Sequence, residues 1–392
     1  MATTKVSGEL VDLNESTSES GLKIPTGTNN NRPATDVAGM IRNNTNESSD
    51  SSASCEEYYN GTAWQKINNI PFPVYYRAVL YTGNSSTQSI TGVGFKPDFI
   101  WIKRRNSAEA SALYDSTRGI NKQLETNSTA AEATNTAPNE GVKSFDADGF
   151  TTGDNGGTNR SPNTYVAYCW KANGGTTSSN TDGNITSTVQ TEAAAGFSIV
   201  QFTNSSPGSS ATVGHGLGST PDMILLKRTD GIEDWYVYHT SMGLSEFMRL
   251  NLTNAQATAG DLFNTVNSTV FNPSFTGASG QVLIAYCFKN ITGYSNFGSY
   301  TGNATAGQAI TTGFQPTWIL IKSTVGNANW RLYDTTRGIT TGGFFRVQGT
   351  NAEDTADAPN LDITATGFEI NANGVSQGLN ASPNLYIYAA FK

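Results

Sequence analysis

Short apolar runs, each bounded by proline on one side and by charge on the other, recur along the chain. Three of them align without gaps: GFKPDFIWIK at 94–103, GSTPDMILLK at 218–227 and GFQPTWILIK at 313–322. Continuous apolar runs of this length predict strands that are buried on both faces. The proline stands at the start of each strand, where it costs no hydrogen bond of the sheet.

A tyrosine follows the last lysine of each run after a constant interval of 11 residues. Tyr114, Tyr238 and Tyr333 open the related segments YDSTRG, YHTSMG and YDTTRG. The constant interval predicts a hairpin whose two strands keep their register while the sequence of its tip varies.

A third apolar phrase closes each copy of the pattern: AYCWK at 167–171, AYCFK at 285–289 and YAAFK at 388–392. We expect this strand to be central and to lie between two sheets. Its alternate positions define one face, which consists of Val166, Tyr168 and Trp170, then Ile284, Tyr286 and Phe288, then Ile387, Ala389 and Phe391.

Cysteine occupies one equivalent position of the closing phrase. Cys169 and Cys287 stand where the third copy has Ala390. We expect equivalent positions of separate copies to lie far apart, so the two thiols should not form a disulfide. A small apolar residue suits the place, and cysteine serves as one.

Several landmarks in one order, three times over, predict three copies of one domain of about 100 residues. We therefore predict an all-β chain with three tandem antiparallel β-sandwich repeats, of jelly-roll or lectin-like form, at 76–175, 176–297 and 298–392. An extended N-terminal segment at 1–75 precedes them. Its serine-rich stretch NNTNESSDSSAS at 43–54 has too few apolar residues to fold alone, so we expect it to be ordered by partners or by oligomerisation.

Charge is scarce on this chain. Only 14% of the residues are Asp, Glu, Lys or Arg, against roughly 25% in ordinary globular domains, and the net charge is −8. A basic patch that could displace counterions from phosphates is lacking, which excludes nucleic acid as an expected partner. We expect no signal peptide, and no apolar stretch is long enough to span a bilayer, so we expect synthesis in the cytoplasm and no membrane insertion.

The two histidines give no reproducible catalytic arrangement. His215 lies in a glycine-rich turn, and His239 stands where the sister copies have Asp115 and Asp334. A Ser-His-Asp triad needs a histidine with a consistent partner, which the chain does not offer. We expect a structural role for both histidines.

Paired carboxylates are the other route to chemistry, because glycoside hydrolysis uses two of them. The segment FDADGF supplies Asp146 and Asp148, but the third copy has a single acid near this place. We predict turn formation, with calcium binding and catalysis as the alternatives. We predict no catalytic residue, no metal site and no cofactor, and hence no enzyme.

The YDSTRG-type segments suggest local braces. Asp115 with Arg118, and Asp334 with Arg337, are spaced so that the aspartate accepts from the turn backbone and the arginine clamps it. Ligand contact is the alternative for these residues.

Two aligned tryptophans, Trp235 and Trp330, stand beside the variable hairpin tips. A partly exposed tryptophan next to amide side chains can hold a sugar ring through its apolar face and hydrogen bonds. Asn327, Asn329 and Trp330, with Trp235 in the second copy, are therefore the candidate ligand platform. Packing beneath the hairpin is the alternative.

Two resemblances cover most of the chain. The stretch GLKIPTGTNNNRPATDVAGMIRNNTNE, followed by EEYYNGTAW, resembles a segment of tail fibres and related fibrous virion proteins of tailed bacteriophages. The repeats resemble an uncharacterised domain found in tandem in phage structural proteins, through GFKPDFIWIK, YDSTRG, SFDADGF, TYVAYCWKA and YSNFGSYTGN. The matching N-terminal residues are Gly27, Thr28, Arg32, Pro33, Gly39, Met40, Ile41, Arg42, Asn44, Thr45, Tyr59, Gly61 and Trp64.

The resemblance implies a structural protein of the virion, a tail fibre or similar appendage. Its N-terminal segment would attach to other virion proteins, its β-sandwiches would contact the host cell surface, and a host glycan is the expected receptor. By similarity to fibres, a homotrimer is expected. The alternatives are a capsid-decoration or head-fibre protein without a receptor site, and a virion polysaccharide depolymerase.

Overall fold

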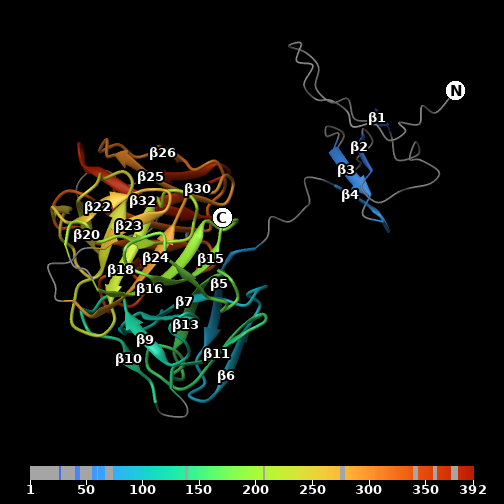
Figure 1. The fold of residues 1–392 in the computed structure, drawn as a ribbon. Coiled ribbons are helices and arrows are strands. Elements are labelled where there is room, and N and C mark those ends of the chain that lie inside the picture. Colours follow the sequence, from blue (N-terminus) through green and yellow to red (C-terminus); the bar gives the residue numbers. More distant parts are fainter. Residues whose placement is uncertain are drawn as a thin grey trace. The chain divides into compact units, whose positions relative to one another are not determined.

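The computed structural model describes residues 26–27, 40–44, 55–59, 61–66, 74–136, 140–205, 208–273, 279–338, 343–355, 360–371 and 378–392. The chain divides into two compact units, residues 1–74 and residues 75–392 (Figure 1). Of the N-terminal motif, Thr28, Arg32, Pro33, Gly39 and Thr45 lie outside the described residues, as does the serine-rich stretch that follows Asn44.

The first unit contains a small sheet with the order β1-β2-β3-β4. β1 pairs in parallel with β2, and the other neighbours are antiparallel. Tyr59 lies opposite Trp64 in the hairpin of β3 and β4, with ring centroids 5.7 Å apart. The bounds are β1 (Thr26–Gly27), β2 (Ile41–Asn44), β3 (Cys55–Tyr59) and β4 (Trp64–Lys66).

The second unit consists of three pairs of antiparallel sheets, each with one large and one three-stranded sheet. We call them the first, second and third pair in chain order. The first pair has a large sheet of β10 (Ala133–Thr134), β9 (Lys122–Glu125), β8 (Ala112–Asp115), β7 (Phe99–Arg104), β13 (Thr164–Trp170) and β5 (Tyr76–Thr82). Its small sheet has β11 (Val142–Asp146), β12 (Gly149–Thr152) and β6 (Gln88–Thr91).

The second pair has the same order of strands with a hairpin added at one edge. Its large sheet runs through β14 (Ser178–Asn180), β15 (Ser187–Glu192), β16 (Phe197–Asn204), β24 (Gln281–Phe288), β18 (Met223–Arg228), β19 (Tyr236–His239), β20 (Glu246–Arg249) and β21 (Ala257–Thr258). Its small sheet has β17 (Val213–Gly214), β23 (Val270–Pro273) and β22 (Leu262–Val266).

The third pair has a large sheet of β25 (Ser295–Thr301), β32 (Leu385–Phe391), β27 (Trp318–Ser323), β28 (Arg331–Asp334) and β29 (Phe345–Arg346). Its small sheet has β26 (Gln308–Thr311), β31 (Gly367–Ile370) and β30 (Leu361–Thr364). The described part of the chain contains no helix, so the all-β prediction is confirmed. β25 crosses the predicted boundary at 297/298.

The predicted hairpin is present in all three pairs with one register. Tyr114 lies opposite Ile100, Tyr238 opposite Ile224, and Tyr333 opposite Ile319. The apolar run of each hairpin is buried throughout its length up to the lysine. The predicted hairpin and the burial of its first strand are therefore confirmed.

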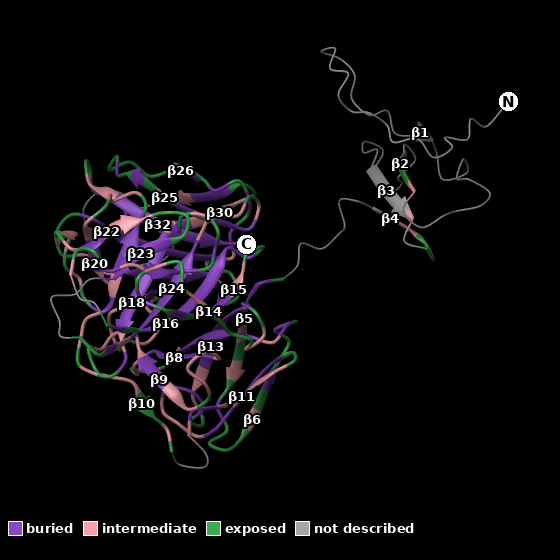
Figure 2. Cartoon of the chain, in the orientation of Figure 1, coloured by how far each residue is buried: buried purple, intermediate pink, exposed green. Residues whose placement is uncertain are grey.

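Each pair of sheets encloses its own apolar core, and a further core lies among the three large sheets. In β13, Tyr165, Ala167 and Cys169 face the core of the first pair, whereas the alternate residues face the shared core. Figure 2 shows the consequence, since buried residues follow strands such as β16, β18 and β24 while the peripheral turns are exposed. The closing strands are thus buried on one face by their own small sheet and on the other by neighbouring pairs.

Aromatic residues at equivalent places of the closing phrase meet in the shared core. The ring centroids of Trp170, Phe288 and Phe391 are 6.4 Å, 5.5 Å and 5.9 Å apart. The expectation that equivalent positions lie far apart is wrong for this position. The expectation holds for Cys169 and Cys287, which are free thiols in different cores. Each cysteine directly precedes the aromatic residue in its strand and therefore points to the opposite face.

Candidate functional site

The predicted ligand platform is not at the surface. Trp235 and Trp330 have exposed fractions of 0% and 1%. Their Nε1 atoms donate to the carbonyl oxygens of Glu125 and Arg249, at 2.9 Å and 2.8 Å, and each carbonyl belongs to a neighbouring pair. The platform prediction is therefore wrong for both tryptophans, because the indole rings are covered by the sheet of another pair.

The two asparagines of that prediction have no exposed tryptophan beside them, because Trp330 is buried. Asn327 is exposed. Asn329 Oδ1 accepts a hydrogen bond from Gln348 Nε2 at 2.5 Å. Neither residue has an exposed indole face beside it, so the predicted sugar platform is not formed.

Asp115 and Asp334 pair with the predicted arginines inside the protein. Asp115 accepts from the backbone N–H of Arg118 at 2.8 Å and from its Nε at 2.5 Å. Asp334 accepts from the backbone N–H of Arg337 at 2.9 Å and also from its Nε. All four side chains have exposed fractions of 1% or less.

These carboxylates also join neighbouring pairs. The hydroxyl of Tyr286 in the second pair donates to Asp115 at 2.7 Å, and the hydroxyl of Tyr168 in the first pair donates to Asp334 at 2.7 Å. Burial raises the pKa of both tyrosines well above the ordinary value, so the hydroxyls remain donors. Each Asp-Arg unit thus binds a tyrosine from the adjacent pair.

The third contact of this kind is built from different residues. Here His239 replaces the aspartate, Met242 replaces the arginine and Ala389 replaces the tyrosine. His239 Nε2 lies 3.1 Å from the carbonyl oxygen of Tyr388, and its Nδ1 accepts from the backbone N–H of Ser241. Burial lowers the pKa of His239 to about 4, which keeps the imidazole neutral.

The three aligned lysines of the apolar runs join neighbouring pairs of sheets, a role that was not predicted from the sequence. Lys227 Nζ donates to the carbonyl oxygen of Thr129 at 3.0 Å, Lys322 Nζ to that of Thr253 at 3.2 Å, and Lys103 Nζ to that of Gly349 at 3.3 Å. Each acceptor belongs to a different pair from its donor. Burial lowers the pKa of all three lysines to about 8.

The hairpin tips lie at the same contacts. The backbone N–H of Glu109 donates to Thr350 O at 2.7 Å. Equivalent bonds run from Glu233 to Thr129 and from Ala328 to Thr253, each at 2.9 Å. The first pair therefore binds the third, the third binds the second, and the second binds the first. We call these three contacts the junctions, and they close the unit into a ring.

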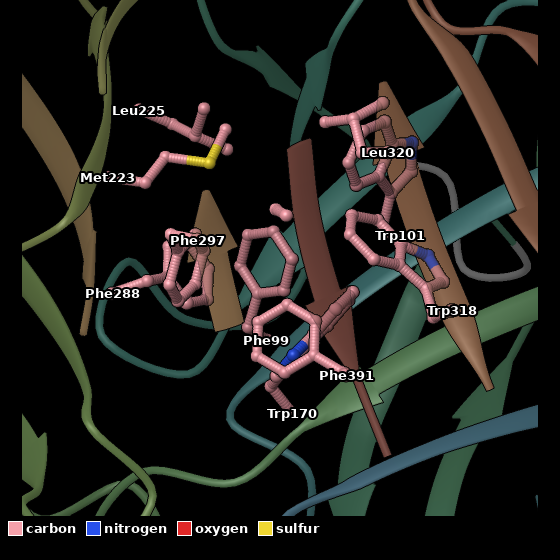
Figure 3. Close-up of a pocket in the computed structure, with 11 residues that line it drawn as sticks. Phe99, Trp101, Trp170, Met223, Leu225, Phe288, Phe297, Trp318, Leu320 and Phe391 are labelled. Atoms are coloured by element: carbon pink, nitrogen blue, oxygen red, sulfur yellow. The ribbon is translucent and has the colours of Figure 1, made fainter. Parts of the chain in front are cut away.

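The ring encloses an apolar cavity of about 20 Å³. Figure 3 shows Trp101, Trp318 and Leu320 on one side of it, Met223 and Leu225 on the other, and phenylalanines between them. All three pairs contribute to its lining. A cavity with such apolar walls and little room offers no polar group to a substrate, so it is a packing feature of the shared core.

Both acids of the FDADGF segment accept hydrogen bonds. Asp148 accepts from the backbone N–H groups of Gly92 and Gly94 at 3.1 Å and 2.5 Å, and these bonds lower the pKa of Asp148. Asp146 accepts from the hydroxyl of Thr151 at 2.8 Å. Asp146 is therefore held by its own hairpin, and Asp148 by the loop that follows β6.

His215 is buried beside another turn. Its Nε2 lies 3.0 Å from the carbonyl oxygen of Asn267 and its Nδ1 accepts from the N–H of Leu217. Among the described residues, no group of three or more His, Cys, Asp or Glu side chains is placed to hold a metal ion. The same part of the chain has no helix long and apolar enough to cross a bilayer.

Comparisons with known proteins identify the family of the second unit. No curated protein and no solved structure matches the chain. A family model described as a domain of unknown function, DUF7483, matches residues 73–392, so one domain covers all three pairs of sheets. The chain therefore belongs to the DUF7483 family.

Proposed function

We propose that this protein is a structural protein of a phage virion, an appendage that contacts the host surface. In this proposal the first unit attaches to other virion proteins and the second unit is the presented head. One observation carries the proposal: the charged and aromatic residues that repeat along the chain are used to join the three pairs of sheets. The resemblance of the sequence to virion proteins supplies the biological setting.

The buried junctions support a mechanical role. Asp115, Arg118, Tyr286 and their counterparts form charge-assisted hydrogen bonds in the interior, where water does not compete. Such a ring presents its outer loops on a rigid scaffold, and loops on rigid scaffolds are a common basis for recognition.

Assembly of the virion protein belongs to the same proposal. The second unit already arranges three sandwiches around one core within a single chain. The expected homotrimer would therefore be formed through the first unit. Multi-angle light scattering of the full chain, compared with a chain that lacks residues 1–74, tests this: we expect a trimer that becomes a monomer when the segment is removed.

Labelling of intact particles tests the proposed function. Antibody fragments against the second unit would be added to virions whose genome encodes the chain, and the particles imaged by electron microscopy. We expect label on an appendage and a loss of adsorption to host cells. Purified particles without label would overturn the proposal.

The same experiment separates the alternatives. Label on the capsid surface with unchanged adsorption indicates a decoration protein. Release of reducing sugar from host polysaccharide by the full chain, abolished in Asp146→Asn or Asp148→Asn, would identify a depolymerase.

A further inference from the structure

The second pair contains an open pocket of about 360 Å³, and its lining includes none of the residues named above at the junctions. One wall is the hairpin of β14 and β15, which has no counterpart among the described strands of the other two large sheets. The second wall is the glycine-rich loop that follows β17, and the third is the turn between β22 and β23. Volumes of roughly 300–1,000 Å³ are usual for small-ligand sites.

The corresponding corner of the first pair is closed by a side chain. There Asp148 fills the space beside the glycine-rich loop and accepts from Gly92 and Gly94. Because Phe150 and Phe271 occupy equivalent places in their small sheets, the residue at the place of Asp148 is Thr269. Thr269 Oγ1 bonds to Asn267 Oδ1 at 3.1 Å instead, which leaves the corner open.

Glycine keeps the floor of the pocket accessible. Gly216 has a φ of +73°, and a Cβ atom at this position would lie 2.8 Å from Thr191 Oγ1 and 3.5 Å from Val189. A side chain there would fill the space above both residues. Thr191 Oγ1, buried beneath Gly216, has no hydrogen-bond partner within the described part of the chain.

The polar groups of the pocket define the chemistry of a ligand. The lining offers the hydroxyls of Ser178, Ser268 and Thr269 and the amide of Asn180, with Val189 as an apolar wall. Asp182 is the charged residue of the lining, and it accepts from Asn180 Nδ2 at 2.9 Å. Among the described residues, the lining contains no lysine or arginine, so an anionic ligand would find no cationic side chain there.

We infer that this pocket is a binding site for a neutral saccharide. Sugar hydroxyls would bond to the serine, threonine and asparagine groups, and the C–H face of the sugar would pack on Val189. The inference rests on the host-attachment function proposed above, and it places recognition in the second pair rather than at the tryptophans.

Two exposed neighbours on β14 provide a matched pair of variants. Ser178 lines the pocket, whereas Ser179 points to the opposite face because side chains alternate along a strand. Saturation-transfer NMR of the full chain would use methyl glycosides of glucose, galactose, mannose and N-acetylglucosamine, with methyl glucuronide as the charged comparison, all at millimolar concentration.

We expect at least one neutral glycoside to bind. Ser178→Tyr should weaken its binding by at least tenfold, Ser179→Tyr should leave it unchanged, and both variants should keep the thermal midpoint of the parent. The inference is overturned if no neutral glycoside binds, if only the glucuronide binds, or if the two variants behave alike. Particle labelling and loss of adsorption would still be observed in those cases if the proposed function holds, so the two failures are distinguishable.

Discussion

Tyr168 donates to Asp334 at the junction of the first and third pairs, and Tyr286 donates to Asp115 at the junction of the second and first pairs. At the remaining junction, His239 lies beside β32, the strand that contains Ala389. This third junction has Ala389 in place of the tyrosine, and His239 and Met242 in place of the aspartate and the arginine. The imidazole occupies this place and bonds to the backbone of Tyr388 instead. At the residue scale, the departures of the second and third copies from the common pattern therefore compensate for one another.

The tyrosine hydroxyls should contribute measurably to stability. Tyr168→Phe or Tyr286→Phe removes a hydrogen bond to a buried carboxylate, and such bonds are worth roughly 1.5–3 kcal/mol. We expect the free energy of unfolding in urea to fall by about 2 kcal/mol for each variant. Tyr388→Phe, which loses a bond to the neutral Asn296, is the control and should cost about 1 kcal/mol. Equal effects of all three would argue against charged junctions.

The compensation at the third junction can be tested by transplanting the common pattern. Ala389→Tyr alone should overpack the space beside His239 and destabilise the protein by roughly 1–3 kcal/mol. Adding His239→Asp and Met242→Arg should recover most of this loss, because the new phenol gains the partners it has elsewhere. Urea denaturation of the parent, Ala389→Tyr, the His239→Asp/Met242→Arg double variant and the triple variant measures the coupling, and purely additive losses would contradict the account.

His239 should make the protein sensitive to mild acid. Its pKa is about 4 in the folded protein, below the ordinary value of 6.5, because burial disfavours the charged form. The folded state therefore has its full stability above pH 6.5 and loses up to about 3 kcal/mol from this group as the pH falls toward 4. His239→Gln should flatten this part of the stability profile between pH 6.5 and 4, measured by urea denaturation. Parallel profiles for parent and variant would exclude His239 as the cause.

At the element scale, each closing strand contributes one face to the core of its own pair and the other face to the shared core. Trp170 and Tyr165 lie on opposite faces of β13, the first in the shared core and the second in the core of its own pair. The same strand therefore stabilises its own sandwich and holds that sandwich to its neighbours.

Two substitutions on β13 should raise hydrogen exchange in different parts of the second unit. Trp170→Ala should cost roughly 3–5 kcal/mol and raise hydrogen exchange in β24 and β32 as well as in β13. Tyr165→Ala should raise exchange in β5, β6 and β12 and leave the other two pairs protected. Exchange mass spectrometry measures both patterns. If Trp170→Ala affects only the first pair, the shared core does not couple the closing strands.

The sequence predicts the elements well because the signals are local. The period of two in the closing phrase and the constant spacing from Lys103 to Tyr114 determine the strands, their register and their buried positions. The same signals do not say which element covers a buried face. Trp330 is covered by the second pair and Tyr168 bonds to Asp334, contacts between residues far apart in the chain that periodicity cannot reveal.

The candidate site shows the same limit. Asn180, Thr191 and Thr269 come from separate segments that have no shared motif, so only the fold brings them together. One available signal was the second copy's lack of an acid at the place of Asp148, where its turn has Ser268 and Thr269. The aligned lysines were visible as a repeated residue, but their acceptors are backbone carbonyls, which leave no trace in the sequence.

At the scale of the whole molecule, the second unit is one ring of three sandwiches and not a string of independent domains. One family model covers residues 73–392, and the contacts of the unit leave it undivided. The junction bonds link the first pair to the third, the third to the second and the second to the first, so each pair is held by both of the others.

Scanning calorimetry of the full chain tests this central claim most directly. If the shared core and the junctions make the second unit a single cooperative structure, its calorimetric enthalpy will equal its van't Hoff enthalpy, and Trp170→Ala will move the whole transition to lower temperature. Three separable transitions, of which only the first responds to Trp170→Ala, would contradict the account.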